Sequence, residues 1–506
     1  MTNASHSAKG RGLKISEIRR CLSDAGLIID EGIVSVSVEV SEICTDSRKI
    51  KRGDVFIAIK GESFDSHTTI PSLLQKDVKP ALVIYSDGQF TRHFTNDCSS
   101  LRVSDTRLAW SLLCALECEF AKTNLEFYGV TGTNGKTSSV FILNHFLKAQ
   151  GKKVLTIGTL GFDFDGETQE TKHTTPDPPE LFAAIRKAHA ASFDVVVMEV
   201  SSHAIAQSKL GPIRFDKVLF TSFSRDHLDF HKSMEDYFCQ KWRLFTDLVK
   251  RSARKVVHES ILPWIEKYCR NHGLDLVIYG EKSSSHPWYL QKLEKNLDAS
   301  RFKLKVAEQE YTLSTNLVGD FLLANTVGCL ALINDLNAQQ FDKIENLPTI
   351  PGRLDRVHHK SLKAPVFVDY AHTPDALETC LRTLRPLTKG RLIVVFGCGG
   401  DRDRGKRPMM GKAAALFADL LIVTSDNPRT EDPSKIILDI VEGFDRDSID
   451  FEVEVNRSKA IAVAVSKADE SDCILIAGKG HEDYQIVGTS KRYFSDHKEV
   501  LKNCQS

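Results

Sequence analysis

Residues 125–157 read LEFYGVTGTNGKTSSVFILNHFLKAQGKKVLTI, and this stretch decides the fold class. A β-rich run over 125–130 enters a loop of glycine and threonine, a helical pattern covers 138–149, and a second strand pattern covers 153–157. This order predicts a βαβ unit, in which parallel strands are joined by a right-handed crossover helix. The sequence therefore indicates an α/β protein built on parallel sheets.

The loop of this unit, Gly132-Thr-Asn-Gly-Lys-Thr137, has the residue types of a phosphate-binding loop. Backbone N–H groups at a helix N-terminus bind phosphate oxygens, a lysine reaches the terminal phosphates, and the threonine after it binds Mg²⁺. The standard pattern has glycine where this chain has Val130, so a Gly-rich turn with a solvated lysine is the alternative. The predicted phosphate contacts are Gly132, Thr133, Asn134, Gly135, Lys136 and Thr137.

Strand and helix patterns continue on both sides of this unit and predict three domains in the 506 residues. Residues 1–124 are expected to form a small N-terminal α/β domain, and residues 125–348 a central doubly wound sheet of the P-loop ATPase type. Pro348, Pro351 and Gly352 mark a linker. Residues 349–506 then alternate strands and helices as in a Rossmann-like doubly wound domain, where ligands bind beyond the C-terminal ends of the strands.

The composition limits the kinds of partner. Lys and Arg together number 67, as do Asp and Glu, so the net charge is zero and no global field attracts nucleic acid or a membrane surface. The start of the chain, 1–14, is polar, and no later run approaches about 18 apolar residues. The twelve cysteines are scattered without metal or redox spacing. We expect a cytoplasmic monomer with reduced thiols that acts on small molecules.

Two further predicted strands end in acidic and histidine residues. Glu199 follows the strand at 194–198, and Ser224-Arg-Asp-His-Leu-Asp229 follows the strand at 217–220. Glu199 can supply a Mg²⁺ ligand beside the loop. The alternatives are a helix cap at Asp226, a surface pair of His227 with His231, or, on weaker spacing, a zinc site.

Five motifs in order, Gly132–Thr137, His173–Pro178, Glu199–His203, Ser224–Asp229 and Asp369–Pro374, closely resemble those of the Mur ligase family of ATP-dependent peptide-bond-forming enzymes. The resemblance extends over nearly the whole chain. It implies the ligase activity that adds the third amino acid to UDP-N-acetylmuramoyl-L-alanyl-D-glutamate in peptidoglycan precursor synthesis, with ATP and Mg²⁺. In that chemistry ATP phosphorylates a carboxylate, and the incoming amine attacks the acyl phosphate.

The resemblance also implies roles for single residues. Lys136, His227 and Lys241 are the implied catalytic residues, and Lys241 matches a lysine that family members carry as a carbamate, although alone it would indicate a solvated helix lysine. The implied Mg²⁺ ligands are Thr137, Glu199, His227 and carbamylated Lys241, and the further nucleotide contacts are Asn325 and Arg353. The implied contacts of the UDP-muramoyl dipeptide are Thr45, Ser47, Thr174, Thr175, Ser201, Gln207 and Lys209.

Three positions depart from the family pattern. Lys209 replaces an arginine and loses bidentate geometry against an anion, although it keeps the charge. Leu322 replaces the first asparagine of Gly-x-Phe-Asn-x-x-Asn, and Ser222 stands where asparagine is common. These departures concern nucleotide and substrate affinity, and the phosphate chemistry should survive them.

The third predicted domain indicates which amino acid is added. The far end of meso-diaminopimelate carries a carboxylate and an ammonium group, so its recognition needs a guanidinium and an acid. Asp426-Asn-Pro-Arg429 resembles the signature of diaminopimelate-adding members, and Arg429 would repel the terminal cation of lysine. The predicted contacts are Arg402, Asp426, Asn427, Pro428, Arg429, Gly478 and Glu482.

The charge run 401–407 could instead be a solvated loop. Other functions stay open at this point. They are the same reaction with L-lysine, a D-alanyl-D-alanine-adding or folylpolyglutamate ligase, and a nucleotide-dependent switch.

Overall fold

The computed structural model describes residues 11–32, 38–61, 63–94, 98–269, 273–334 and 338–504. The chain divides into two compact units. The first comprises Met1–Val140, Gln150–Val256 and Ile261–Leu276, and the second Phe141–Ala149, Val257–Ser260 and Val277–Ser506. The division into three domains at 124/125 and 348/349 stays a prediction.

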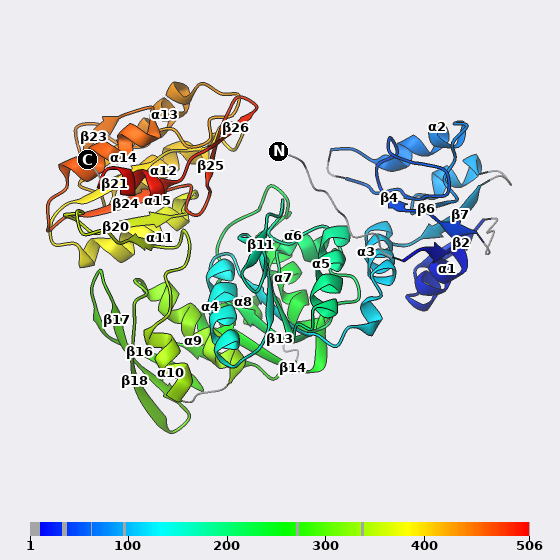
Figure 1. The fold of residues 1–506 in the computed structure, drawn as a ribbon, viewed down its shortest axis with the longest axis horizontal. Helices are drawn as coiled ribbons and strands as arrows, with labels where there is room; N and C mark the ends of the chain where they lie inside the picture. Colours follow the sequence, from blue (N-terminus) through cyan, green and yellow to red (C-terminus); the bar gives the residue numbers. More distant parts are fainter. Residues whose placement is uncertain are drawn as a thin grey trace. The chain divides into compact units, whose positions relative to one another are not determined.

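The first unit begins with a small α/β sheet, drawn in blue in Figure 1. Its strand order is β2 (Ile28–Glu31), β7 (Ser99–Val103), β6 (Leu82–Tyr85), β5 (Val55–Ile57) and β4 (Ile43–Cys44), parallel except for β2. Strand residues alternate between the faces, so Val55 and Ile57 pack with α1 (Ile15–Asp24) and α3 (Thr106–Glu117), and Phe56 packs with α2 (Ile70–Leu74). A short ribbon pairs β1 (Leu13–Lys14) with β3 (Glu39–Val40).

The stretch that decides the fold class forms the centre of a second sheet in this unit. β8 (Glu126–Thr131) and β9 (Val154–Gly158) are both parallel to β12 (Val195–Glu199), which lies between them. α4 (Lys136–Ala149) connects β8 to β9, so the predicted parallel crossover is confirmed. The order is β11 (Glu167–Gln169), β10 (Gly161–Phe164), β9, β12, β8, β13 (Phe215–Phe220) and β14 (Val249–His258), and the helices are α5 (Pro178–Ala190), α6 (Ser202–Ala206), α7 (Met234–Thr246) and α8 (Leu262–Tyr268).

The second unit contains two groups of strands. β15 (Val277–Gly280) is parallel to β16 (Trp288–Lys295), which continues as an antiparallel meander with β17 (Ser300–Val306) and β18 (Gln309–Thr315). α9 (Asp320–Ile333) and α10 (Ala338–Glu345) follow. The other sheet has the order β19 (Asp355–Val357), β20 (Val366–Asp369), β24 (Cys473–Ala477), β21 (Leu392–Phe396), β22 (Leu420–Val423) and β23 (Asp450–Val453), and only β19 is antiparallel.

Helices cover both faces of this C-terminal sheet, as a doubly wound domain requires. α11 (Pro374–Leu384), α12 (Lys406–Ala415) and α13 (Pro433–Val441) pack on one face, and α14 (Arg457–Lys467) and α15 (Asp496–Lys502) on the other. A hairpin, β25 (Tyr484–Val487) with β26 (Ser490–Tyr493), lies outside the sheet. The strands β21, β22 and β24 lead into 399–405, 426–431 and 478–482, so the predicted motifs share one sheet edge.

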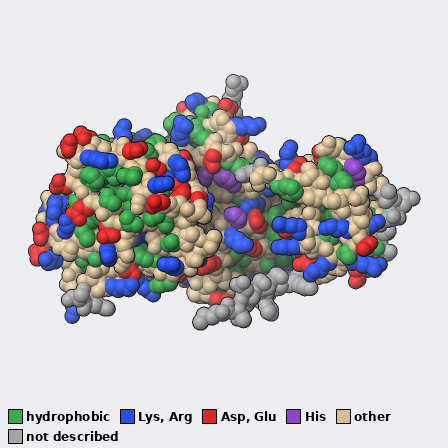
Figure 2. Space-filling view, turned by 90° about the horizontal axis from the view of Figure 1, so that it is seen from above, with side chains coloured by type: hydrophobic (Ala, Val, Ile, Leu, Met, Phe, Trp, Pro, Cys, Tyr) green, Lys and Arg blue, Asp and Glu red, His purple; other side chains and the backbone are tan. Residues whose placement is uncertain are grey.

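The cysteines and the surface charges of the structure can be compared with the composition. The twelve cysteines all lie in the described ranges, and none of them forms a disulfide. Lysine and arginine side chains intermingle with aspartate and glutamate on the face drawn in Figure 2. Within the described ranges, every helix is too short or too polar to cross a membrane.

Candidate active site

The loop after β8 is held by the end of β13. Gly132 and Gly135 have φ angles of 153° and 89°, which favour glycine, and a Cβ on Gly132 would lie 2.1 Å from Thr221 Oγ1. Ser222 Oγ accepts from the backbone N–H of Asn134 at 3.0 Å and donates to its carbonyl at 3.0 Å. Ser222, one of the departures from the family pattern, therefore supports the loop.

Packing also explains Val130, which stands where the standard phosphate-binding loop has glycine. Val130 is fully buried in β8, and its neighbour Gly129 cannot carry a side chain because a Cβ there would lie 2.9 Å from the Phe215 ring. Gly129 thus serves the contact between β8 and β13 rather than the loop. α4 begins at Lys136, so Lys136 and Thr137 stand in its first turn, where unpaired helix N–H groups favour anions.

Two lysine amines meet at one carbonyl of the loop. Lys136 Nζ donates to the carbonyls of Gly132 and Thr133, both at 2.9 Å, and Lys241 Nζ donates to the same Gly132 carbonyl at 2.9 Å. Lys241 is only 1% exposed on α7, so the interpretation as a solvated helix lysine is wrong. Burial, with help from Lys136, holds the pKa of Lys241 well below its usual range.

A histidine cluster lies beside these lysines. The rings of His203 and His227 meet edge to face with centroids 4.7 Å apart. Burial lowers the pKa of His227, against the nearby Asp226 and with Lys136 adding to the decrease, and burial lowers that of His203 to about 4. Both rings therefore favour the neutral form near pH 7.

The structural alternatives for this segment do not hold. His231 is buried and its Nε2 lies 2.9 Å from Ser202 Oγ, so it forms no surface pair with His227. Ser233, not Asp226, caps α7. Among the described residues no group of three His, Cys, Asp or Glu side chains could hold a metal ion, so neither a zinc site nor a site that joins Glu199 and His227 to a third such residue is formed.

Glu199 at the end of β12 lies among threonines. Its carboxylate accepts from the backbone N–H of Thr159 at 2.7 Å, and Thr159 Oγ1 lies 3.2 Å from Thr174 Oγ1. Thr175 Oγ1 donates to the carbonyl of Glu199 at 2.9 Å and accepts from the backbone N–H of Ser201 at 3.1 Å. The structure thus brings three predicted substrate contacts beside the predicted metal ligand.

Two more predicted substrate contacts follow on α6 and after it. Gln207 is the residue at the C-terminus of α6. Lys209 Nζ pairs with Asp177 of the 173–178 motif at 2.7 Å, a partner that the sequence analysis did not identify. Thr45 and Ser47 stand after β4 in the N-terminal sheet, on either side of Asp46, which pairs with Arg48 at 2.9 Å.

In the second unit, Asn325 and Arg353 belong to different elements. Asn325 lies on α9 and is 5% exposed, while Leu322 on the same helix is fully buried and packs as a core residue. The Arg353 guanidinium lies 5.1 Å from the centroid of the Tyr370 ring. Asp369 at the end of β20 accepts from the backbone N–H groups of Leu354 and Ala371 at 2.6 and 2.8 Å.

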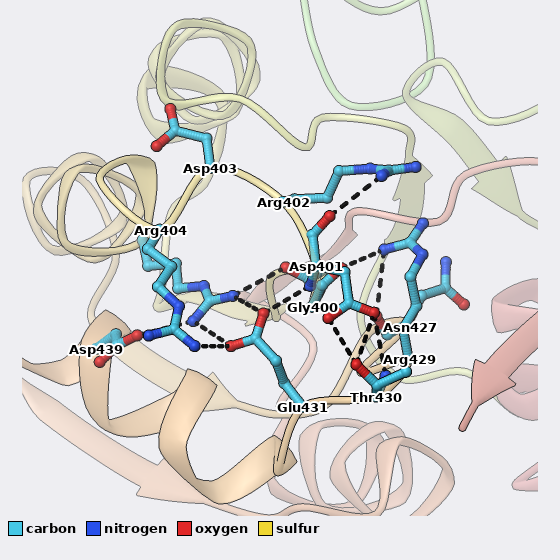
Figure 3. Close-up of polar contacts among 12 residues, drawn as sticks. Gly400, Asp401, Arg402, Asp403, Arg404, Asn427, Arg429, Thr430, Glu431 and Asp439 are labelled. Carbon is cyan, nitrogen blue, oxygen red and sulfur yellow. Dashed lines mark hydrogen bonds and ion pairs between the residues drawn. The ribbon is translucent and has the colours of Figure 1, made fainter. Parts of the chain in front are cut away.

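The structure gathers the predicted amino-acid contacts at one edge of the C-terminal sheet. A Cβ built on Gly399 would lie 3.0 Å from Arg429 Nη1 and 3.7 Å from Arg402 Cγ, so both arginines border this glycine. Figure 3 shows Arg402 and Arg429 extending on one side of the turn at Asp401. Two arginine side chains beside one glycine offer guanidinium groups of the kind that binds a carboxylate.

An acid is held in place in the same region. Asn427 Nδ2 donates to Glu482 Oε2 at 3.0 Å, and Lys479 Nζ pairs with the same oxygen at 3.0 Å. Gly478 has a φ of 116°, and a Cβ there would lie 2.7 Å from Asp426 Oδ2. Lys479 is fully buried and was missed, although it stands inside a predicted motif.

The hairpin fixes the segment that carries Arg429. The backbone N–H of Arg429 donates to the carbonyl of Ile486 at 3.1 Å, and that of Gly488 donates to the carbonyl of Arg429 at 2.7 Å. The backbone N–H of Ile486 also donates to Asn427 Oδ1 at 2.9 Å. Pro428 therefore lies between two residues that are each bonded to β25 and its turn.

A parallel sheet whose glycine-rich loop leads into a helix, followed by a doubly wound domain with charged residues at the carboxyl ends of its strands, is typical of nucleotide-dependent enzymes. Residues 130–333 match the Mur ligase middle domain, and residues 352–480 match the Mur ligase glutamate ligase domain. The chain belongs to the Mur ligase family.

Its relatives include two bacterial proteins named UDP-N-acetylmuramoyl-L-alanyl-D-glutamate–2,6-diaminopimelate ligase. The Clostridium perfringens protein is 38% identical over 475 residues, which is 92% of this chain and 94% of that protein. The Aquifex aeolicus protein is 38% identical over 91% of this chain and 94% of that protein. A solved structure with the same ligase name is 28% identical, with a TM-score of 0.67, and covers 98% of this chain and 99% of that one.

Proposed function

We propose that the protein is a cytoplasmic, monomeric, ATP-dependent ligase that joins meso-diaminopimelate to the D-glutamate of UDP-N-acetylmuramoyl-L-alanyl-D-glutamate. The observation that carries this proposal is the site at Gly399, where Arg402 and Arg429 border one glycine and Glu482 is bonded to Asn427 of the loop that carries Arg429. This charge set complements a carboxylate and an ammonium group on one carbon. The names of the relatives support the same substrate.

The other half of the proposed reaction takes place at the loop 132–137. A carboxylate oxygen of the dipeptide attacks the γ-phosphorus of ATP and ADP leaves, after which the amine attacks the acyl carbon and phosphate leaves. Lys136, in the first turn of α4, neutralises the two anions as they approach. The hydroxyl of Thr137 and the carboxylate of Glu199 are oxygen ligands that fit Mg²⁺, which supplies further positive charge when bound.

In this proposal Lys241 reacts with CO₂ to form a carbamate. Its burial and lowered pKa favour the neutral amine, whose lone pair forms the N–C bond while one proton is released. The product is an anion next to Lys136, where it can act as a metal ligand. Incubation with ¹³C-labelled bicarbonate should give a carbamate signal in the ¹³C spectrum, and a Lys241→Arg protein should lack it.

The function is tested by phosphate release from ATP with Mg²⁺ and the UDP-muramoyl dipeptide, with meso-diaminopimelate or L-lysine added. We expect turnover with meso-diaminopimelate. In an Arg429→Ala protein the KM for meso-diaminopimelate should be at least about tenfold higher. Arg446→Ala is the matched control, because Arg446 is exposed in the same sheet domain. Turnover with L-lysine but not with meso-diaminopimelate would refute the proposed specificity. No phosphate release with either amine would favour another ligase of the family.

A nucleotide-dependent switch is distinguished in the same assay. A switch hydrolyses ATP or GTP without a second substrate, whereas the proposed ligase releases phosphate at an appreciable rate only when the dipeptide and the amine are both present. Nucleotide hydrolysis that does not respond to either cosubstrate would therefore refute the ligase proposal.

A further inference from the structure

The loop 399–405 after β21 is fastened to the loop 426–431 after β22 by contacts that the proposed reaction does not use. The backbone N–H of Gly400 donates to the carbonyl of Asn427 at 2.9 Å, and Thr430 Oγ1 donates to Asp401 Oδ1 at 2.8 Å. The backbone N–H of Asp401 donates to Glu431 Oε1 at 2.6 Å. Each loop carries one of the two arginines that border Gly399.

Glu431 is itself held by a buried cation. Arg407 is 1% exposed, and its Nη2 and Nη1 lie 2.8 and 3.1 Å from the two carboxylate oxygens of Glu431. Asp439 pairs with the same guanidinium at 2.8 Å, and Arg404 reaches Glu431 from the solvent side at 3.0 Å. The interpretation of 401–407 as a solvated loop holds for 401–405, which are exposed, and fails at Arg407, which is buried on α12.

The turn that Glu431 bonds has an uncommon backbone. Asp401 has a φ of 52°, in the left-handed region that side chains other than glycine rarely adopt and that Asp tolerates better than most. Its N–H bond to Glu431 and its carboxylate bonds to Thr430 keep the turn in this conformation. Arg402 follows directly, so the direction of its side chain depends on this turn (Figure 3).

The same turn also holds the second arginine. Arg429 Nη1 donates to the carbonyl of Gly400 at 2.7 Å, the residue just before Asp401. Arg429 has a left-handed φ of 50° as well. A shift of the loop 399–405 would therefore move the side chains of both Arg402 and Arg429.

We propose that Glu431, clamped by Arg407, is a positioning residue that sets the specificity of the amino-acid site, because it fixes the turn at Asp401 and thereby the spacing of Arg402 and Arg429. The ligand of this pair is the carboxylate at the far end of the amino-acid substrate. The inference rests on the proposed function, since that carboxylate is what separates diaminopimelate from lysine. Glu431 itself touches no reacting atom.

The test compares Glu431→Gln, which keeps the shape but loses the charge, with Thr430→Val, which removes only the hydroxyl donor to Asp401. We expect the KM for meso-diaminopimelate to rise about tenfold in the first protein and about threefold in the second. The KM values for ATP and the UDP-muramoyl dipeptide, and kcat at saturating amine, should stay within about twofold. Glu452→Gln is the control, because it breaks an exposed ion pair with Lys467 in the same domain.

Several outcomes overturn the inference. An unchanged KM for meso-diaminopimelate in the folded Glu431→Gln protein would refute it. An equal rise of the KM values for meso-diaminopimelate, ATP and the UDP-muramoyl dipeptide would also refute it, because it would indicate a merely structural role. If Glu431→Gln does not fold, the KM for meso-diaminopimelate in Thr430→Val tests the inference by the same criterion. The Thr430 side chain is exposed, and loss of its hydroxyl leaves Arg407 paired with Glu431. A wild-type protein inactive with meso-diaminopimelate instead removes the proposed function, and the inference with it.

Discussion

Asp496→Asn should strongly destabilise the C-terminal sheet domain. Arg457 at the start of α14 and Asp496 at the start of α15 both have fully buried side chains. Two bonds of 2.7 Å join Arg457 Nε and Nη2 to the two carboxylate oxygens, and Nη2 also donates to the carbonyl of Ala477 at 2.9 Å. Ala477 ends β24 and precedes Gly478, so this pair supports the edge that carries the amino-acid site.

The magnitude follows from the burial. The asparagine variant keeps one acceptor but leaves a buried guanidinium charge without its counter-charge, and breaking such a pair costs about 3–5 kcal/mol. For a cooperative unit of about 150–250 residues each kcal/mol lowers Tm by roughly 2–4 °C, which gives a decrease of about 6–20 °C. An Arg457→Met, Asp496→Leu double variant removes both charges and should recover most of this loss.

The assay is thermal and urea unfolding followed by circular dichroism at constant ionic strength. Glu452→Gln is the matched control, since Glu452 pairs with Lys467 and both are well exposed, and its loss should cost less than about 1 kcal/mol. A loss below about 1 kcal/mol in Asp496→Asn, or a double variant no more stable than the single one, would refute the reasoning.

Three further predictions concern the two sites. Lys136→Met should lower the rate of phosphate release about 10³-fold or more with unchanged Tm, and a near-normal kcat would contradict the charge role of Lys136. Gly399→Ala places a Cβ 3.0 Å from Arg429 Nη1 and should raise the KM for meso-diaminopimelate several-fold, with no effect on that for the UDP-muramoyl dipeptide. Arg407 and its neighbours lower the pKa of Glu431 from 4.5 to about 2, so its stabilisation is present above about pH 4.5 and is lost as the pH falls towards 2. Acid unfolding of Glu431→Gln should lack this dependence, and identical acid-unfolding curves would contradict it.

Local sequence patterns predicted the helices and strands but not the order of the strands in the sheets. The parallel crossover and the doubly wound C-terminal sheet follow from strand and helix periodicity, which short segments such as 125–157 contain in full. That β12 lies between β8 and β9 could not be predicted in this way, because strand order is set by packing between segments far apart in the chain. The same holds for Gly129, whose missing side chain serves Phe215 on another strand.

In the candidate sites, too, residues within one contiguous motif could be predicted, and residues whose partners lie far away in the sequence could not. Gly132–Thr137 was recognisable because its residues are contiguous and their backbone makes the site. Lys241 lies 109 residues from the carbonyl it contacts, and nothing in its helical pattern distinguishes it from a solvated lysine. Arg407 and Glu431 were likewise hidden, because a charged residue in a polar loop predicts exposure unless its counter-charge is known. Family motifs could indicate Lys241, but not the clamp around Glu431.

The charge content of the two sites differs in a way that fits two different ligands. At the phosphate-binding loop the positive charge comes from Lys136 and from the N-terminus of α4, which suit the phosphates of a nucleotide, whereas burial favours the neutral form of Lys241. At the C-terminal sheet, Arg402 and Arg429 are balanced by Glu482, and Lys479 and Asn427 hold that acid in place. A mixed site of this kind prefers a ligand with both charges on one carbon, and the lone cation at the end of lysine would meet two guanidinium groups without a carboxylate to offset them. Specificity for diaminopimelate is therefore expected to combine attraction of its distal carboxylate with repulsion of the wrong amine.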